Sequence, residues 1–237
     1  MPGEPMLRQL LLITDGCSNL GTDPVYIAQV GRGRGIATSV IGIVDDGALG
    51  ERGRTEARNI AEAGGGMCRI VRATDLAQTV QMVTRQTMQL TLGQVVNAEL
   101  RGIIGGDADA LPPETRSKVA GVVDRMSEEV LLELGLVIDV SASMTSKMNA
   151  VREAIRDLEF GLKARTGESD MFVVTYPGEQ GETAVLHRRI GGAGMIADVI
   201  GGLRPAGNTP TGPALELAIH TILDSVSWQG SNQHHVV

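Results

Sequence analysis

The chain has 237 residues, of which 42% are hydrophobic and 21% charged. This length and balance are typical of one large globular domain with a full core. The formal net charge of −7 argues against nucleic acid and anionic membrane surfaces as main partners.

The cysteine content and the hydropathy pattern favour a protein of the cytosol. Cys17 and Cys68 are too few for a disulfide framework and are typical of a reducing compartment. The N-terminal segment has no basic region followed by an apolar one, and no stretch approaches the roughly 18 apolar residues of a membrane span. We therefore expect no signal peptide, no membrane contact and a cytoplasmic location.

The first third of the chain alternates strand and helix patterns. A helix start is predicted at Thr22-Asp23-Pro24, where capping residues precede a proline in the first turn. Alternating βα units of this kind are typical of a parallel sheet. The predicted strands are 7–14, 37–44 and 67–71, and a second helix is predicted at 49–63.

A long helical region separates the two halves of the chain. Thr74 and Asp75 are suited to cap a helix whose apolar positions continue from Leu76 to Ile104. The clearest linker follows at 105–114, with the sequence GGDADALPPE, and a second, shorter helix comes after it.

The last part of the chain returns to strands and helices. We expect strands at 134–139 and 171–176, an antiparallel edge strand at 182–188, helices at 146–165, 191–200 and 211–223, and an irregular tail at 225–237.

The strand at 134–139 ends in oxygen-bearing side chains. Its near-continuous apolar run is typical of a strand covered on both faces. Asp139, Ser141 and Ser143 follow with the spacing D-x-S-x-S. In open α/β sheets, ligands bind outside the carboxyl ends of the strands. One carboxylate and two hydroxyls there supply half of the oxygen shell of a hard cation such as Mg²⁺.

Two distant segments carry the side chains that would complete this shell. Asp15 ends the apolar strand LLLITDG, and Thr209 precedes Pro210 in GNTPTGP, where a helix would start. With D-x-S-x-S, these segments resemble the metal-ion-dependent adhesion site of the von Willebrand factor A family. In most members T-D-G comes last, whereas here it comes first. The chain therefore resembles a circular permutant, similar to the small bacterial YabS-like subfamily.

The resemblance implies one domain spanning 1–237 with a three-layer, Rossmann-like α/β fold. Helices would cover both faces of a six-stranded, mostly parallel sheet with one antiparallel edge strand, in the order 6-5-4-1-2-3. Residues 1–90 would correspond to the C-terminal half of the family, 91–130 to a helical joining segment, and 131–224 to the N-terminal half. Asp139 and Asp15 would then face the same crevice.

The resemblance also implies a function. Asp139, Ser141, Ser143, Thr209 and Asp15 would hold Mg²⁺, with Mn²⁺ as the alternative ion, and would leave one coordination position open. A partner protein would fill that position with an Asp or Glu carboxylate. We therefore expect a metal-dependent protein-binding module and not an enzyme.

Three alternatives remain open from the sequence. A metal-assisted hydrolase or phosphatase could use the same site, but it needs a positioned base or nucleophile. None of the three site segments contains histidine, and Lys147 is the one cation beside the cluster. Thr211 could replace Thr209 as a ligand, although it is better placed to cap the following helix. Met144 suits either an apolar rim of the site or the core.

Overall fold

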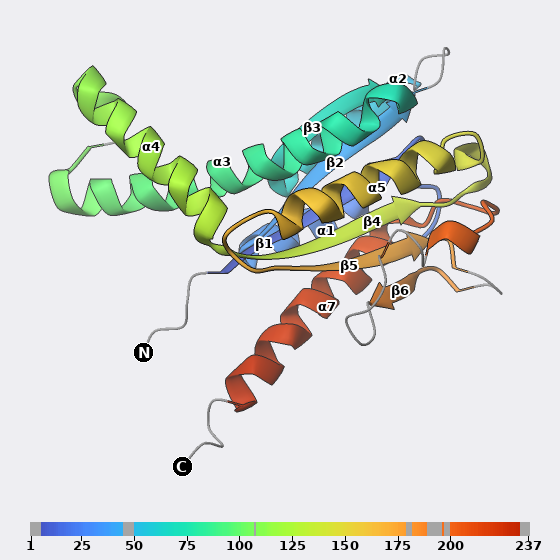
Figure 1. The fold of residues 1–237 in the computed structure, drawn as a ribbon. Helices are drawn as coiled ribbons and strands as arrows, with labels where there is room; N and C mark the ends of the chain where they lie inside the picture. Colours follow the sequence, from blue (N-terminus) through green and yellow to red (C-terminus); the bar gives the residue numbers. More distant parts are fainter. Residues whose placement is uncertain are drawn as a thin grey trace.

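A six-stranded sheet forms the middle layer of the molecule (Figure 1). This computed structural model describes residues 6–44, 50–106, 108–178, 182–188, 196 and 200–232. The strands are β1 (Met6–Thr14), β2 (Ile36–Val44), β3 (Gly65–Arg72), β4 (Leu131–Asp139), β5 (Ser169–Tyr176) and β6 (Val185–Arg188). Their order is β3-β2-β1-β4-β5-β6, and every neighbouring pair is parallel except β5 and β6. The expected strand order and antiparallel edge are confirmed.

Helices cover both faces of this sheet (Figure 1). The helices are α1 (Pro24–Gly33), α2 (Glu51–Ala63), α3 (Leu76–Ile104), α4 (Pro113–Glu129), α5 (Met148–Lys163) and α7 (Thr211–Asn232). Helices α3 and α5 pack on one face, and α1, α2 and α7 pack on the other. No helix in the described part of the chain is long and apolar enough to cross a lipid bilayer.

The central strand β4 is buried on both faces, as its apolar run predicts. Leu134 and Leu136 face α3 and α5, whereas Val137 faces the opposite core cluster. Gly135 also lies toward that second cluster, where a Cβ atom would come within 2.5 Å of the Phe172 ring. The glycine therefore leaves room for a large side chain of the neighbouring strand.

Helix α3 spans residue 91, where the predicted helical joining segment at 91–130 begins, without a break. The first half of α3 packs on the sheet through residues such as Val80. Its second half and α4 extend beyond the sheet as a helical hairpin (Figure 1). Gln89 donates a hydrogen bond to Asp124 across this hairpin, with 2.7 Å between Nε2 and Oδ1.

Two predicted helix ends differ from the structure. At the start of α3, Asp75 makes no side-chain cap, and its carbonyl instead accepts a hydrogen bond from the Thr79 hydroxyl. At the other end of the chain, α7 continues to Asn232, whereas an irregular tail was expected from residue 225. Helix propagation adds one hydrogen bond per residue once a helix is anchored, so contacts at residue 225 can extend it.

Two other expectations concern residues outside the described ranges. Within the helix predicted at 191–200, residues 191–195 and 197–199 lie outside the described residues. The last part of the predicted tail, 233–237, also lies outside them.

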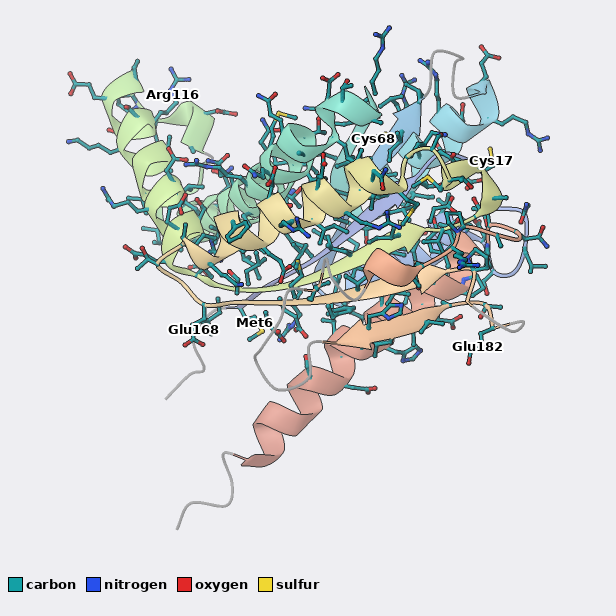
Figure 2. All side chains as sticks on the ribbon, turned by 45° about the vertical axis from the view of Figure 1, so that its right-hand side comes forward. Met6, Cys17, Cys68, Arg116, Glu168 and Glu182 are labelled. Carbon is teal, nitrogen blue, oxygen red and sulfur yellow. The ribbon has the colours of Figure 1, made fainter. Side chains whose placement is uncertain are left out.

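Two residues near the ends of the described chain, Arg8 and Ser225, meet at the amino ends of the strands. Ser225 of α7 donates a hydrogen bond to Glu133 Oε1 at 2.7 Å, and Arg8 of β1 places Nε 3.9 Å from Glu133 Oε2. Figure 2 shows Met6 at this end of the sheet and Cys17 at the opposite end. The carboxyl ends of β1 and β4 thus lie far from the chain ends.

Candidate metal centre

Asp139 is the last residue of β4 and has no exposed surface. Its Oδ2 accepts a hydrogen bond from the Thr14 hydroxyl at 2.7 Å, and its Oδ1 accepts one from the Ser141 N–H at 2.8 Å. Burial raises the pKa of Asp139, and these two hydrogen bonds oppose that shift. Thr14 lies beside Asp139 because the preceding residues, Ile13 and Ile138, are paired in adjacent parallel strands.

A row of side-chain hydrogen bonds links Asp15 to the D-x-S-x-S segment. The Ser141 and Ser143 hydroxyl oxygens are 3.1 Å apart, and Ser143 donates to Asp15 Oδ1 at 2.7 Å. A 3₁₀ turn at Ala142–Met144 shapes this segment, and Met144 is fully buried in the core. The structure thus brings together four of the five predicted ligands and places Met144 in the core, not on a rim.

Lys147 forms a buried ion pair at this centre. Its ammonium nitrogen lies 2.8 Å from Asp15 Oδ2 and donates to the Ser143 carbonyl oxygen at 3.1 Å. The Lys147 and Asp15 side chains are only 6% and 3% exposed. Both oxygens of Asp15 are therefore engaged, one by Ser143 and one by Lys147. The centre holds two carboxylates and one ammonium.

Thr209 reaches the same edge through the backbone of its loop. Asn19 donates its N–H to the Thr209 carbonyl at 3.1 Å, and the Thr209 N–H donates to the Asn19 side-chain oxygen at 2.9 Å. On the other side, the Ala206 N–H donates to the Val140 carbonyl at 2.9 Å. The Thr209 loop is therefore tied both to the segment after β1 and to the D-x-S-x-S segment. Thr211 is the first residue of α7.

The centre offers oxygen atoms of the kinds that hard divalent cations prefer. Its predicted donors are two carboxylates and three hydroxyls, a set that suits Mg²⁺ or Mn²⁺. Across the described ranges, no three His, Cys, Asp or Glu side chains gather into a group that could hold a metal ion. Below the centre, burial and the charge of Asp139 raise the pKa of Tyr176 well above its usual value, so its phenol stays protonated.

The sequence did not predict three sets of contacts at this centre, namely those of the Thr14 hydroxyl, of Asn19 and of the Lys147 ammonium. Thr14 is the first residue of the T-D-G motif and Asn19 lies in no motif, and the contacts of both depend on which strand and loop lie beside them. Lys147 follows Ser143 by four residues, and its bond to the Ser143 carbonyl repeats the i, i+4 spacing of a helical turn. That spacing is the one signal from which its position could have been found.

Relatives of the chain are found in bacteria. No model of a known protein family matches the chain. YabS of Bacillus subtilis is 40% identical over 214 residues, which cover 90% of this chain and 87% of YabS. The crystal structure of a protein from Alicyclobacillus acidocaldarius is similar with a TM-score of 0.86 and 45% identity, covering 94% of this chain and 96% of that one. Identity at this level extends over both halves of the sheet and over the segment between them, and the chain therefore belongs to the family of YabS.

Proposed function

We propose that the chain is a permuted module of the von Willebrand factor A type that binds a partner protein through a metal ion. One observation carries this proposal. Residues from the ends of β1 and β4, more than a hundred positions apart in sequence, form one hydrogen-bonded row of Asp15, Ser143 and Ser141 beside the buried Asp139. Loops from distant parts of the chain converge in this way at a ligand site outside strand ends.

The predicted ligands form two groups, Asp15 on the one hand and Asp139 with the three hydroxyl groups on the other. Asp15 would help to hold the ion through Ser143, because its two oxygens are engaged by Ser143 and Lys147. The hydroxyls of Ser141, Ser143 and Thr209 would hold Mg²⁺ together with Asp139. When bound, Mg²⁺ supplies an open coordination position for a carboxylate from outside.

The charges at the centre favour such an anionic partner. The ammonium of Lys147 offsets one of the two carboxylates, so the protein only partly neutralises a divalent ion. The resulting positive charge favours an Asp or Glu side chain from a partner. Lys147 is also held by Asp15 and by a carbonyl, which disfavours its use as a clamp for a phosphoryl group. These contacts support a binding module over a phosphatase.

The chain ends support the permuted arrangement. A permutant must bring its present ends together, because they replace a continuous segment in the unpermuted fold. Arg8 and Ser225 both contact Glu133, as this arrangement requires. The segment of α3 and α4 would then connect what are the two ends of the chain in other members.

Calorimetry with Mn²⁺ tests the metal centre. Asp139→Asn is the sharpest variant, because it keeps the size of the buried side chain while it removes the charge that a cation requires. We expect wild-type protein to bind one Mn²⁺ and Asp139→Asn to lose at least about a hundredfold in affinity, or about 2.7 kcal/mol. Asp157→Asn, at an exposed position on α5, serves as the control and should bind as wild type. Equal affinity in Asp139→Asn and wild type would refute the assignment.

A pull-down from bacterial lysate tests the role of the metal. A partner should be retained with Mg²⁺ and released by EDTA, and a phosphatase assay with Mg²⁺ should stay at background. For a captured partner, a double-mutant cycle between Thr209→Ala and its acidic residue should show coupling, since the metal links the two. Strictly additive losses would mean that the partner binds elsewhere.

A further inference from the structure

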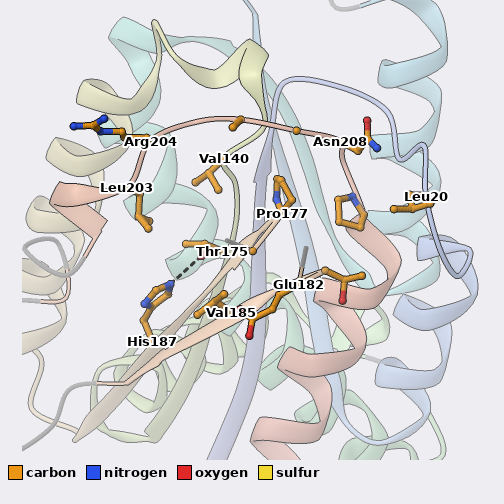
Figure 3. Close-up of a pocket in the computed structure, with 15 residues that line it drawn as sticks. Leu20, Val140, Thr175, Pro177, Glu182, Val185, His187, Leu203, Arg204 and Asn208 are labelled. Carbon is orange, nitrogen blue, oxygen red and sulfur yellow. Dashed lines mark hydrogen bonds between the residues drawn. The ribbon is translucent and has the colours of Figure 1, made fainter. Parts of the chain in front are cut away.

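A cavity of about 750 Å³ opens beside the candidate metal centre (Figure 3). Its volume lies in the range of pockets that bind ligands, about 300–1,000 Å³. It is lined by residues of β5 and β6, of the segments that follow β4 and β5, and of the loop before α7, including Val140, Thr175, Pro177, Val185, His187 and Leu203.

The cavity shares its walls with the metal centre. Val140 lines it and lies between Asp139 and Ser141, and Asn208 and Pro210 line it on either side of Thr209. Val140 is itself held in place, because its N–H donates to the Tyr176 carbonyl at 2.6 Å. A ligand on the metal centre would therefore lie next to the mouth of the cavity.

The inner surface of the cavity suits an apolar group. The Thr175 hydroxyl and His187 Nε2 are 2.8 Å apart and hydrogen-bonded, as the dashed line in Figure 3 shows. Because these polar atoms satisfy each other, an apolar side chain beside them would leave neither one unpaired. Val185 and Leu203 provide aliphatic surface around this pair.

The charged groups of the cavity lie in exposed positions and carry opposite signs. Arg204 and Glu182 are both exposed lining residues (Figure 3). The cavity would therefore not select a ligand by its net charge. Apolar contact is the remaining basis for selection, and its free energy amounts to about 25 cal/mol per Å² of buried surface.

We propose that this cavity binds an apolar side chain of the same peptide segment whose acidic side chain reaches the metal centre. This inference rests on the proposed function and names the class of partner: an extended segment with Asp or Glu and a bulky apolar residue nearby. In an extended chain, side chains two positions apart point to the same side and are about 6.5–7 Å apart. A segment lying across Val140 can thus engage both sites.

The test uses fluorescein-labelled peptides of nine residues with a central Asp in a Gly-Ser background. One peptide is the parent, and the others carry a single Leu or Phe one, two or three positions to either side of the Asp. Fluorescence anisotropy is measured with the full chain in Mg²⁺. We expect at least one apolar position to tighten binding about tenfold over the parent, and a central Asn or EDTA to abolish binding.

Two variants on the same strand separate the cavity from the metal centre. Val185→Trp fills the cavity and should remove the tenfold gain while Mn²⁺ affinity stays at the wild-type value. Leu186→Trp is the matched control, because the next residue of β6 points to the other face and does not line the cavity. It should keep the gain.

The outcomes distinguish the two proposals. Binding that depends on the Asp and on Mg²⁺ but gains nothing from Leu or Phe overturns the cavity proposal and leaves the metal proposal standing. A gain that persists in Val185→Trp also overturns it. A wild-type protein that binds no Mn²⁺, or peptides that bind equally with Asp and Asn, overturns both.

Discussion

At the scale of single residues, the ammonium of Lys147 lies 2.8 Å from one oxygen of Asp15, while the other oxygen accepts a hydrogen bond from Ser143. A buried ion pair loses hydration on both sides and is held only while its geometry is good. Without a divalent ion, Lys147 offsets the charge of Asp15. With one, the ammonium and the metal repel each other. Lys147 should therefore weaken metal binding while it stabilises the protein without metal.

Replacing Lys147 with methionine tests this balance. Lys147→Met keeps most of the aliphatic side chain and removes its charge, so we expect Mn²⁺ to bind about tenfold more tightly, or by about 1.4 kcal/mol. Without metal, the variant should melt at a lower temperature, because Asp15 loses its partner. Calorimetry and thermal unfolding measure both effects, with Lys163→Met in the last turn of α5 as the control. Unchanged or weaker Mn²⁺ binding in Lys147→Met would contradict this role.

The sequence predicts the acidic and hydroxyl groups of the centre better than their neighbours. Asp139, Ser141 and Ser143 fall within five residues after an apolar strand, and the structure joins them by short-range contacts. Thr14 and Asn19 depend instead on contacts across 125 and 190 positions of the chain. Spacing along one segment carries no information about such contacts, so the partners of the predicted residues could not be found from the sequence.

At the scale of elements, β4 is the strand on which the rest is arranged. It lies between β1 and β5 and carries the first residues of the candidate centre at its carboxyl end. Within its run of large apolar side chains, β4 has a glycine at position 135. A Cβ atom there would lie 2.5 Å from Phe172 and 2.6 Å from Leu10. The position of β4 against its neighbours thus depends on this missing side chain.

Gly135→Ala should lower the free energy of unfolding by about 1–3 kcal/mol, because an added methyl group overpacks the core. Urea unfolding followed by circular dichroism measures the change. Gly93→Ala is the matched control: it adds the same methyl group within α3, where nothing lies within 4 Å, and should stabilise the helix by up to about 1 kcal/mol. A Gly135→Ala protein as stable as wild type would show that Phe172 and Leu10 move aside freely.

Strands were predicted more reliably than helix ends, for a physical reason. The central parallel strand β4 is covered on both faces, so most of its length reads as one apolar run. Helix α7 was predicted to end at residue 223, yet it continues to Asn232. Its extension coincides with the bond from Ser225 to Glu133, a residue of a strand 92 positions away. When a helix end depends on such a tertiary contact, the local sequence contains no pattern that predicts it.

At the scale of the whole molecule, the chain ends and the candidate centre lie at opposite ends of the strands. Glu133 brings Arg8 and Ser225 together at the amino end of the sheet. The hairpin of α3 and α4 connects the two halves of the sheet, and the turn between these helices lies beyond the sheet (Figure 1). If the chain is a permutant, the present ends can be joined and the connection at this turn can be opened without loss of the fold.

A rearranged chain tests this directly. It begins at Pro112, runs through residue 232, continues through about twelve Gly and Ser residues into Met6, and ends at residue 106. Twelve extended residues span about 40 Å, which should exceed the gap, since α7 continues only seven residues, or about 10 Å, beyond Ser225. We expect this chain to fold, to melt within about 5 °C of wild type, and to bind Mn²⁺ with unchanged affinity.

A second rearrangement with the same linker, opened between Gly135 and Leu136, cuts the central strand and should not fold. Failure of both chains would contradict the permuted reading. Folding of the first chain without Mn²⁺ binding would mean that the metal centre requires an unbroken connection between α3 and α4, which its position at the far end of the strands does not predict.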